Sequence, residues 1–139
     1  MQKLTLAVLA LVATPAFAAE PVTIYRDPSC GCCGEWADYM KDHGYDVTVI
    51  DDTNVAERAM AAGVPERGLS CHHSEIGGYE VHGHVPEKVI ARLLAERPAI
   101  TGVILPGMPE NSPGMASEEY GTLKVFSYGP DGIAVYSNE

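Results

Sequence analysis

Residues 22–34 read VTIYRDPSCGCCG, and this stretch decides the fold. Its first four residues are all β-branched or aromatic, which indicates a β-strand. Three cysteines follow within four positions, at Cys30, Cys32 and Cys33. Residues 35–43 then have the pattern of a helix that ends at a glycine. The sequence therefore predicts a loop rich in thiols between a strand and the start of a helix.

The thiol motif allows two kinds of chemistry. A helix N-terminus carries a partial positive charge that favours thiolate, and thiolate is both a nucleophile and a metal ligand. Cys30 and Cys33 have the spacing of a dithiol oxidoreductase, but Cys32 adds a third thiol that invites disulfide scrambling, which such an enzyme would avoid. Extra soft sulfur ligands instead favour Cu(I), zinc or iron–sulfur centres. The adjacent pair Cys32 and Cys33 is better suited to bridging neighbouring ions than to chelating one ion. A structural disulfide is the remaining interpretation.

The first eighteen residues have the features of a secretory signal peptide. Lys3 supplies the basic region, residues 4–12 are apolar, and residues 16–18 (AFA) form a small-residue cleavage site. The apolar run is too short for a membrane span, which needs about 20 residues. We expect cleavage after Ala18, which leaves residues 19–139 as a single exported, periplasmic domain. In that oxidising compartment unprotected cysteines tend to form disulfides.

The charge of the chain argues against nucleic acid as a partner. The formal net charge is −10 and the isoelectric point is about 4.8, whereas nucleic-acid binding needs clustered positive charge. No later segment is apolar and long enough to insert into a membrane. We interpret the acidic surface mainly as a solubility feature.

The order of the predicted elements defines the fold class. Strands are predicted at 22–25 and 45–50, and residues 69–85 form a hairpin broken by two glycines. Helices are predicted at 35–43, at 87–96, and in a segment that Thr53 or Asn54 caps and that ends at Ala62. The order β-α-β-α-β-β-α is that of the thioredoxin fold. We therefore predict an α/β, thioredoxin-like domain with a mixed sheet flanked by helices, followed by an irregular loop and a C-terminal hairpin within 123–136.

The fourth cysteine should lie close to the first three. Cys71 falls at the start of the third predicted strand, where thioredoxin-like proteins usually have a cis-proline that faces the active-site loop. If the topology holds, four sulfur atoms converge from two segments that are distant in the sequence.

Four histidines accompany Cys71, and they are His72, His73, His82 and His84. Neutral imidazole is a good ligand for copper or zinc. Side chains alternate along a strand, so His82 and His84 are predicted to share one face. By the same alternation, His72 should leave the sheet on the face opposite to Cys71. A ligand role is as well supported for one of these histidines as a purely structural role.

Two methionines lie in a proline- and glycine-rich segment, residues 106–115, that has neither helical nor strand periodicity. The thioethers of Met108 and Met115 are soft, neutral ligands that suit Cu(I). The alternative is that both residues only fill gaps over the loop.

Four motifs together resemble the CopG-type copper-resistance proteins, a family long known only as an exported domain of unknown function. They are CGCC at 30–33, SCH at 70–72, GHVP at 83–86 and PGMP…SPGM over 106–115. The resemblance covers nearly all of the mature chain in the same order. It implies a thioredoxin-like fold, a periplasmic location and copper bound by cysteines.

The resemblance also carries over by position to individual residues. The implied cluster ligands are Cys30, Cys32, Cys33 and Cys71. The motif residues with less defined roles are His72, His84, Met108 and Met115, whereas His73 and His82 are additional to the motif.

These observations predict a periplasmic copper-binding protein that serves copper tolerance. The expected cofactor is a polynuclear Cu(I)–thiolate cluster with several ions per chain. Copper redox activity and a periplasmic copper-handling or redox partner protein are compatible with it, and storage and oxidation-state change both remain open. The alternatives are a thiol–disulfide oxidoreductase that uses Cys30 and Cys33, and a structural zinc site.

Overall fold

A computed structural model describes residues 18–115 and 122–139 of the chain. The expected signal peptide therefore lies outside the described residues except for Ala18. Within the described part, no helix is long and apolar enough to cross a membrane.

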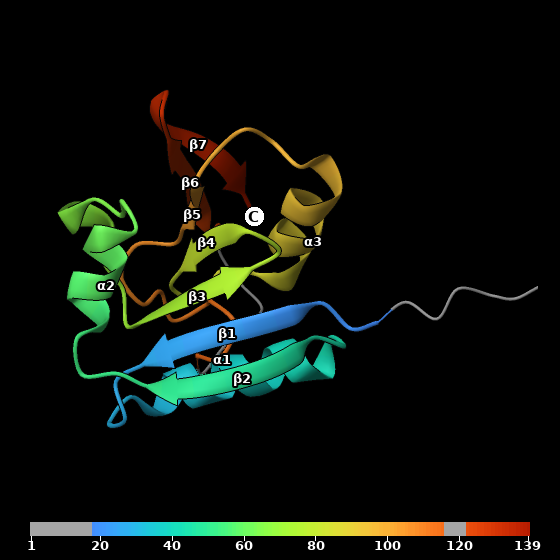
Figure 1. Cartoon of the computed structure of the whole chain (residues 1–139), viewed down its shortest axis with the longest axis vertical. Coiled ribbons are helices and arrows are strands. Elements are labelled where there is room, and N and C mark those ends of the chain that lie inside the picture. The colour runs from blue at the N-terminus through green and yellow to red at the C-terminus, as the bar shows by residue number, and fades with distance from the viewer. Residues whose placement is uncertain (1–17, 116–121) are drawn as a thin grey trace, which may run out of the picture.

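Seven strands of the described residues form one mixed sheet in the order β2-β1-β3-β4-β5-β6-β7 (Figure 1). The strands are β1 (Pro21–Arg26), β2 (Asp46–Asp51), β3 (His72–Ile76), β4 (Tyr79–His82), β5 (Gly102–Ile104), β6 (Lys124–Gly129) and β7 (Gly132–Asn138). The helices are α1 (Gly31–Asp42), α2 (Val55–Ala61) and α3 (Glu87–Glu96), with a short 3₁₀ turn at Glu66–Gly68.

The observed topology confirms the predicted α/β class. β1 and β2 are parallel and α1 connects them, while β3 runs antiparallel to β1 and forms a hairpin with β4. This element order is the one expected for a thioredoxin-like domain. The C-terminal hairpin β6–β7 is also present and extends the same sheet.

One strand was not predicted. β5 has only three residues, Gly102–Ile104, and so offers too little sequence for a period-two pattern. It pairs parallel to β4 and antiparallel to β6. The short strand therefore joins the C-terminal hairpin to the rest of the sheet.

The two faces of the sheet have different cores. The main core lies under α1 and α3 and contains Trp36, Met40, Ile90 and Leu93, all 0% exposed. The opposite face has a smaller cluster, formed by Ala59 with Val64, Ile104 and Tyr128. Because strand residues alternate between faces, successive residues of β3 and β4 point alternately toward the side of the main core and toward the side of the smaller cluster.

Helix α1 begins earlier than predicted. Cys30 is its N-cap, so Cys32 and Cys33 lie in the first helical turn and not in a preceding loop. Glycine and cysteine have poor helix propensity, which is why the sequence pattern failed here. Tertiary burial decides instead, since Cys33, Trp36 and Met40 continue one buried stripe at helical spacing.

Gly83 makes a sharp turn immediately after β4. Its φ of 85° lies in the left-handed region that favours glycine. A Cβ at this position would be 2.4 Å from the carbonyl oxygen of Leu105 and 2.9 Å from Ser70 Oγ. The turn redirects the chain, so that His84 does not continue the alternation of β4.

Replacing Gly83 by alanine should destabilise the protein more than the same change at Gly44. Gly44 has nearly the same φ, 88°, but a Cβ there would have nothing within 4 Å. We expect Gly44→Ala to lower the free energy of unfolding by about 1 kcal/mol through backbone strain alone. Gly83→Ala adds overpacking to this strain and should cost about 2–4 kcal/mol in total. Urea denaturation of both variants measures this, and equal losses would contradict the close approach described at Gly83.

Candidate metal centre

Four sulfur atoms meet at one end of β1 and β3. The Sγ atoms of Cys30, Cys32, Cys33 and Cys71 all lie within 4.8 Å of one another. Cys30 and Cys32 are 3.4 Å apart, and Cys32 is 4.0 Å from Cys71. The arrangement follows from the pairing of Arg26 with His72, which places the end of β1 beside the start of β3. The predicted approach of Cys71 to the thiol motif is confirmed, with trans peptide bonds throughout the described chain.

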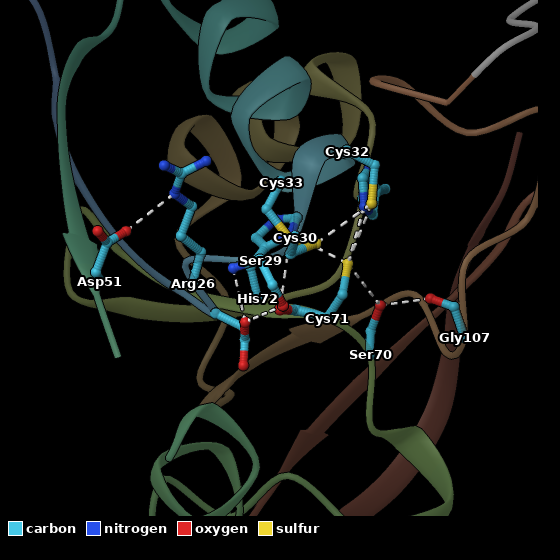
Figure 2. The surroundings of a disulfide bond; sticks show 12 residues. Arg26, Ser29, Cys30, Cys32, Cys33, Asp51, Ser70, Cys71, His72 and Gly107 are labelled. Atoms are coloured by element: carbon cyan, nitrogen blue, oxygen red, sulfur yellow. Dashed lines mark hydrogen bonds and ion pairs between the residues drawn. A yellow bond between two sulfur atoms is a disulfide. The ribbon is translucent and has the colours of Figure 1, made fainter. Parts of the chain in front are cut away.

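Cys30 and Cys33 form a disulfide, whereas Cys32 and Cys71 are free thiols (Figure 2). Cys33 is fully buried and its Sγ lies 3.4 Å from the Cys71 carbonyl oxygen. A disulfide sulfur is not a thiolate. All four sulfurs become thiolate ligands only after a two-electron reduction cleaves this bond and yields two thiols.

The ring of His84 is oriented toward the sulfur atoms. Its Nδ1 is 2.7 Å from the carbonyl oxygen of Pro113, which can only accept, so Nδ1 carries the proton. The unprotonated Nε2 then lies 3.0 Å from Cys71 Sγ and accepts from its S–H. A histidine whose second nitrogen is held by a carbonyl group is the usual arrangement around protein-bound metals.

His72 lies beside the same sulfur. Its Nδ1 is 3.7 Å from Cys71 Sγ, and its ring packs against Trp36 and edge-on against His84. The expectation that His72 would point away from Cys71 was wrong, because Cys71 precedes β3 and does not take part in its alternation. His72 Nε2 is buried without a hydrogen-bond partner in the described residues.

The imidazoles of His72 and His84 form a second group of potential ligands with two of the sulfurs. Cys33, Cys71, His72 and His84 each offer one atom within 4.8 Å of the others. This group shares Cys33 and Cys71 with the group of four cysteines. Two neighbouring sites with common sulfurs are the arrangement that bridging thiolates require.

The charge states of these side chains follow from burial. Burial lowers the pKa of His72 well below its usual range, with a further contribution from His84, and lowers that of His84 as well. Both rings are therefore neutral and able to act as ligands. Burial and the neighbouring Cys32 raise the pKa of the Cys71 thiol. A metal that binds Cys71 must displace its proton.

His73 and His82 lie on the other face of the sheet. They are directly opposite each other in the β3–β4 register, and their Nδ1 atoms are 3.4 Å apart. The prediction that His82 and His84 share a face was therefore wrong, because the positive φ of Gly83 turns the chain between them. Neither His73 nor His82 belongs to the close ligand groups in the described part of the chain.

The methionine segment, residues 106–115, is held beside the sulfur site by hydrogen bonds. Ser70 Oγ donates to the Gly107 carbonyl, and the Pro113 carbonyl accepts from His84. Farther along, the backbone of Gly114 lies against α1, where a Cβ would be 2.7 Å from the Trp36 amide nitrogen. Met108 is 52% exposed and Met115 is half-buried. The segment thus adjoins the site, while the ligand role of the two thioethers stays a prediction.

Sequence reasoning missed the residues that orient the site. The Pro113 carbonyl fixes the His84 tautomer, and Ser70 contacts both Cys71 and Gly107. Both lie inside motifs that were recognised, SCH and SPGM, but a backbone carbonyl leaves no signal in the identity of a side chain.

Comparison with known proteins agrees with the geometry. A family model described as "Protein of unknown function, DUF411" matches residues 69–115. A solved structure named "Copper resistance protein copG- Form 2" superposes with a TM-score of 0.80 at 32% identity, covering 87% of this chain and 98% of that one. The chain belongs to the CopG family. A second CopG structure, Form 1, has a TM-score of 0.78 at 32% identity, covering 86% of this chain and 96% of that one. No curated protein sequence matches the chain.

The family model and the structural match differ in how much of the CopG motif set they cover. The family model spans Cys71, His72, His84, Met108 and Met115, but it begins after the CGCC motif. The structural match extends over most of the described chain. Membership in the CopG family confirms the resemblance that the four motifs indicated.

The metal-free protein should lose stability as pH falls below about 6.5. Unfolded histidines titrate near that value, whereas burial and the neighbouring His73 lower the folded pKa of His82 to about 3. Burial lowers the folded pKa of His72 and of His84 as well. Between these values the unfolded chain binds more protons, so stability that is complete above pH 6.5 is lost as pH falls toward 3.

Each such histidine contributes at most about 1.4 kcal/mol per pH unit to this loss. Urea midpoints measured on either side of pH 6.5 give the slope, and His82→Gln should reduce it by roughly one histidine's share. A midpoint that stays constant below pH 6.5 would show that these rings are protonated in the folded state.

Proposed function

We propose that this CopG-family protein is a periplasmic copper-binding protein for copper tolerance that holds a polynuclear Cu(I)–thiolate cluster. The proposed ligands are Cys30, Cys32, Cys33 and Cys71, with His72 and His84 as additional ligands. The observation that carries the proposal is the pair of overlapping ligand groups that share Cys33 and Cys71.

The donor set fits Cu(I) on chemical grounds. Thiolate, neutral imidazole and thioether are the soft or intermediate ligands that Cu(I) prefers, and carboxylates are absent from both ligand groups. The homologues of known structure are named copper resistance proteins. Support for the periplasmic location comes from the residue 1–18 sequence pattern.

Each contributing side chain has a separate task in this proposal. The four sulfurs bind and bridge the copper ions. His84 presents the lone pair of Nε2 because the Pro113 carbonyl fixes its tautomer. Trp36 packs against His72 and excludes water from the inner side of the site.

A second candidate function rests on the Cys30–Cys33 disulfide. The two cysteines have dithiol spacing at the start of α1, which is the position of the reactive pair in thioredoxin-like oxidoreductases. In that function Cys30–Cys33 would accept two electrons and two protons from a substrate dithiol, which would leave as a disulfide. Copper binding is favoured because Cys32, Cys71 and His84 have no part in such an exchange.

Replacement of Cys32 separates the two functions. Cys32→Ser should reduce the copper content of the fully reduced protein by at least one ion per chain, because this sulfur lies close to both Cys30 and Cys71. An oxidoreductase would retain disulfide exchange after the same change. Metal analysis of anaerobically loaded protein, with copper and zinc measured together, gives the result.

Ser29→Ala serves as a control, since it alters an exposed side chain in the turn before the motif and removes no sulfur. Unchanged copper content in Cys32→Ser would refute the cluster. Bound zinc in place of copper in protein purified from the periplasm would favour the structural zinc site.

The methionines are tested by removing their sulfur while keeping their bulk. We propose that Met108 and Met115 supply thioethers to the copper site from the 106–115 segment. The double change to leucine should speed transfer of Cu(I) to a chelator about tenfold, as expected for the loss of about 1.4 kcal/mol of binding free energy, and leave metal-free stability nearly unchanged.

Met60→Leu is the matched control, because Met60 is similarly exposed (45%) but lies on α2. Equal transfer rates in the double variant and the control, or a large loss of metal-free stability, would assign the two methionines to packing.

A further inference from the structure

The imidazoles of His73 and His82 have no role in the function proposed above, yet they are almost completely buried. Their exposed fractions are 1% and 0%. They face one another across the β3–β4 hairpin, on the side of the sheet that α2 covers. A buried polar pair is tolerated only where donors and acceptors match, so the direction of each hydrogen bond can be derived.

Ser70, His82, His73 and Glu80 form a series of hydrogen bonds, and one backbone amide sets the direction of all of them. The Ser70 N–H can only donate, and it lies 2.7 Å from His82 Nε2, which must therefore be unprotonated. The proton of the neutral His82 ring is then on Nδ1 and is donated to His73 Nδ1. This leaves the His73 proton on Nε2, 2.7 Å from a carboxylate oxygen of Glu80. Each of the four ring nitrogens of His73 and His82 therefore has a partner of the correct kind.

With these proton positions the two histidines are not arranged to hold a metal ion. A separation of 3.4 Å would suit two nitrogen ligands of one ion. However, His82 Nδ1 carries a proton and has no lone pair to offer. Among the described residues no third ligand atom completes a close group with these two rings.

Ser70 is the point where three parts of the protein join. Its amide is bound to His82, and its Oγ donates to the Gly107 carbonyl oxygen and lies 3.9 Å from Cys71 Sγ. Gly107 N–H donates in turn to the Leu69 carbonyl, at 3.2 Å. Figure 2 shows Ser70 between Cys71 and Gly107. The position of Ser70 therefore determines how Cys71 and the 106–115 segment lie relative to each other.

We propose that His82, supported by His73 and Glu80, is a positioning residue that fixes Ser70 and thereby the location of Cys71 Sγ and of the methionine segment. The proposal rests on the proposed function in taking Cys71 as a copper ligand. The series reaches Cys71 only through the backbone of Ser70, so it carries neither protons nor electrons to the sulfur. Its effect is on geometry, as for the groups that orient metal ligands in other proteins.

Three variants test the series. His82→Phe keeps a ring but removes the acceptor for the Ser70 amide, whereas the amide oxygen of His82→Gln can replace Nε2 as that acceptor. His73 contacts neither Ser70 nor Cys71. His73→Phe nevertheless leaves His82 Nδ1–H without an acceptor, so the His82 ring is free to change tautomer. We expect both phenylalanine variants to accelerate Cu(I) transfer to a chelator, and alkylation of Cys71 in the reduced metal-free protein, by about tenfold. His82→Gln should stay within about threefold of the unaltered protein.

A stability control separates positioning from general loosening. Gly44→Ala lowers stability beyond the C-terminal end of α1, whereas the thiol motif lies at the N-terminal end of that helix, so both rates should stay unchanged. If it accelerates them as much as His82→Phe does, or if His82→Phe has no effect, the positioning role is wrong. Failure of His82→Gln to restore the rates would also overturn it.

Two of the readouts do not depend on copper. Two-bond ¹⁵N–¹H spectra of the metal-free protein should identify His82 as the Nδ1–H tautomer and His73 as the Nε2–H tautomer, and the reverse tautomer of His82 would refute the series. If the unaltered protein binds no copper while Cys71 alkylation still responds to these variants, the proposed function fails and the positioning of Cys71 stands.

Discussion

The antiparallel pairing of β1 with β3 is the constraint on which the candidate site depends. It places Arg26 opposite His72, so the thiol motif that follows β1 meets the cysteine that precedes β3. Cys30 and Cys71 are far apart in sequence, and no local interaction could join them. The same register assigns His72 to the face under α1 and His73 to the face under α2. One strand pairing thus separates the potential ligands from the structural histidines.

Burial of the neutral imidazoles determines which of their nitrogens carry a proton. His72, His82 and His84 are each 0% exposed, and a buried ring N–H without a hydrogen-bond acceptor costs free energy. Carbonyl and amide groups of Pro113 and Ser70 therefore decide which nitrogen of His84 and of His82 carries hydrogen. For His82 and His84 a backbone group, rather than another side chain, thus fixes which nitrogen can act as a ligand or acceptor.

Much of this could be predicted from sequence, and the failures have physical causes. Local patterns in the sequence were enough for three features. They are the β-branched run of β1, the glycine pair that breaks the β3–β4 hairpin, and the apolar residues at helical spacing in α3. The first turn of α1 did not follow such a pattern, because burial of Cys33 outweighed the poor helix propensity of its neighbours. The faces of the histidines were misjudged because Gly83 departs from strand geometry. Hydrogen bonds to Ser70 and Pro113 depend on distant backbone and leave no local pattern.

The contact between Trp36 and His72 has a practical consequence. Trp36 is the only tryptophan of the chain, it is completely buried, and its ring centroid is 4.5 Å from that of His72. Its indole N–H is also bonded to the Val85 carbonyl, which holds the ring in place. The tryptophan fluorescence of the protein therefore comes from a single fixed indole beside one imidazole. The molecule carries its own optical reporter for events at His72, and no label has to be introduced near the sulfur atoms.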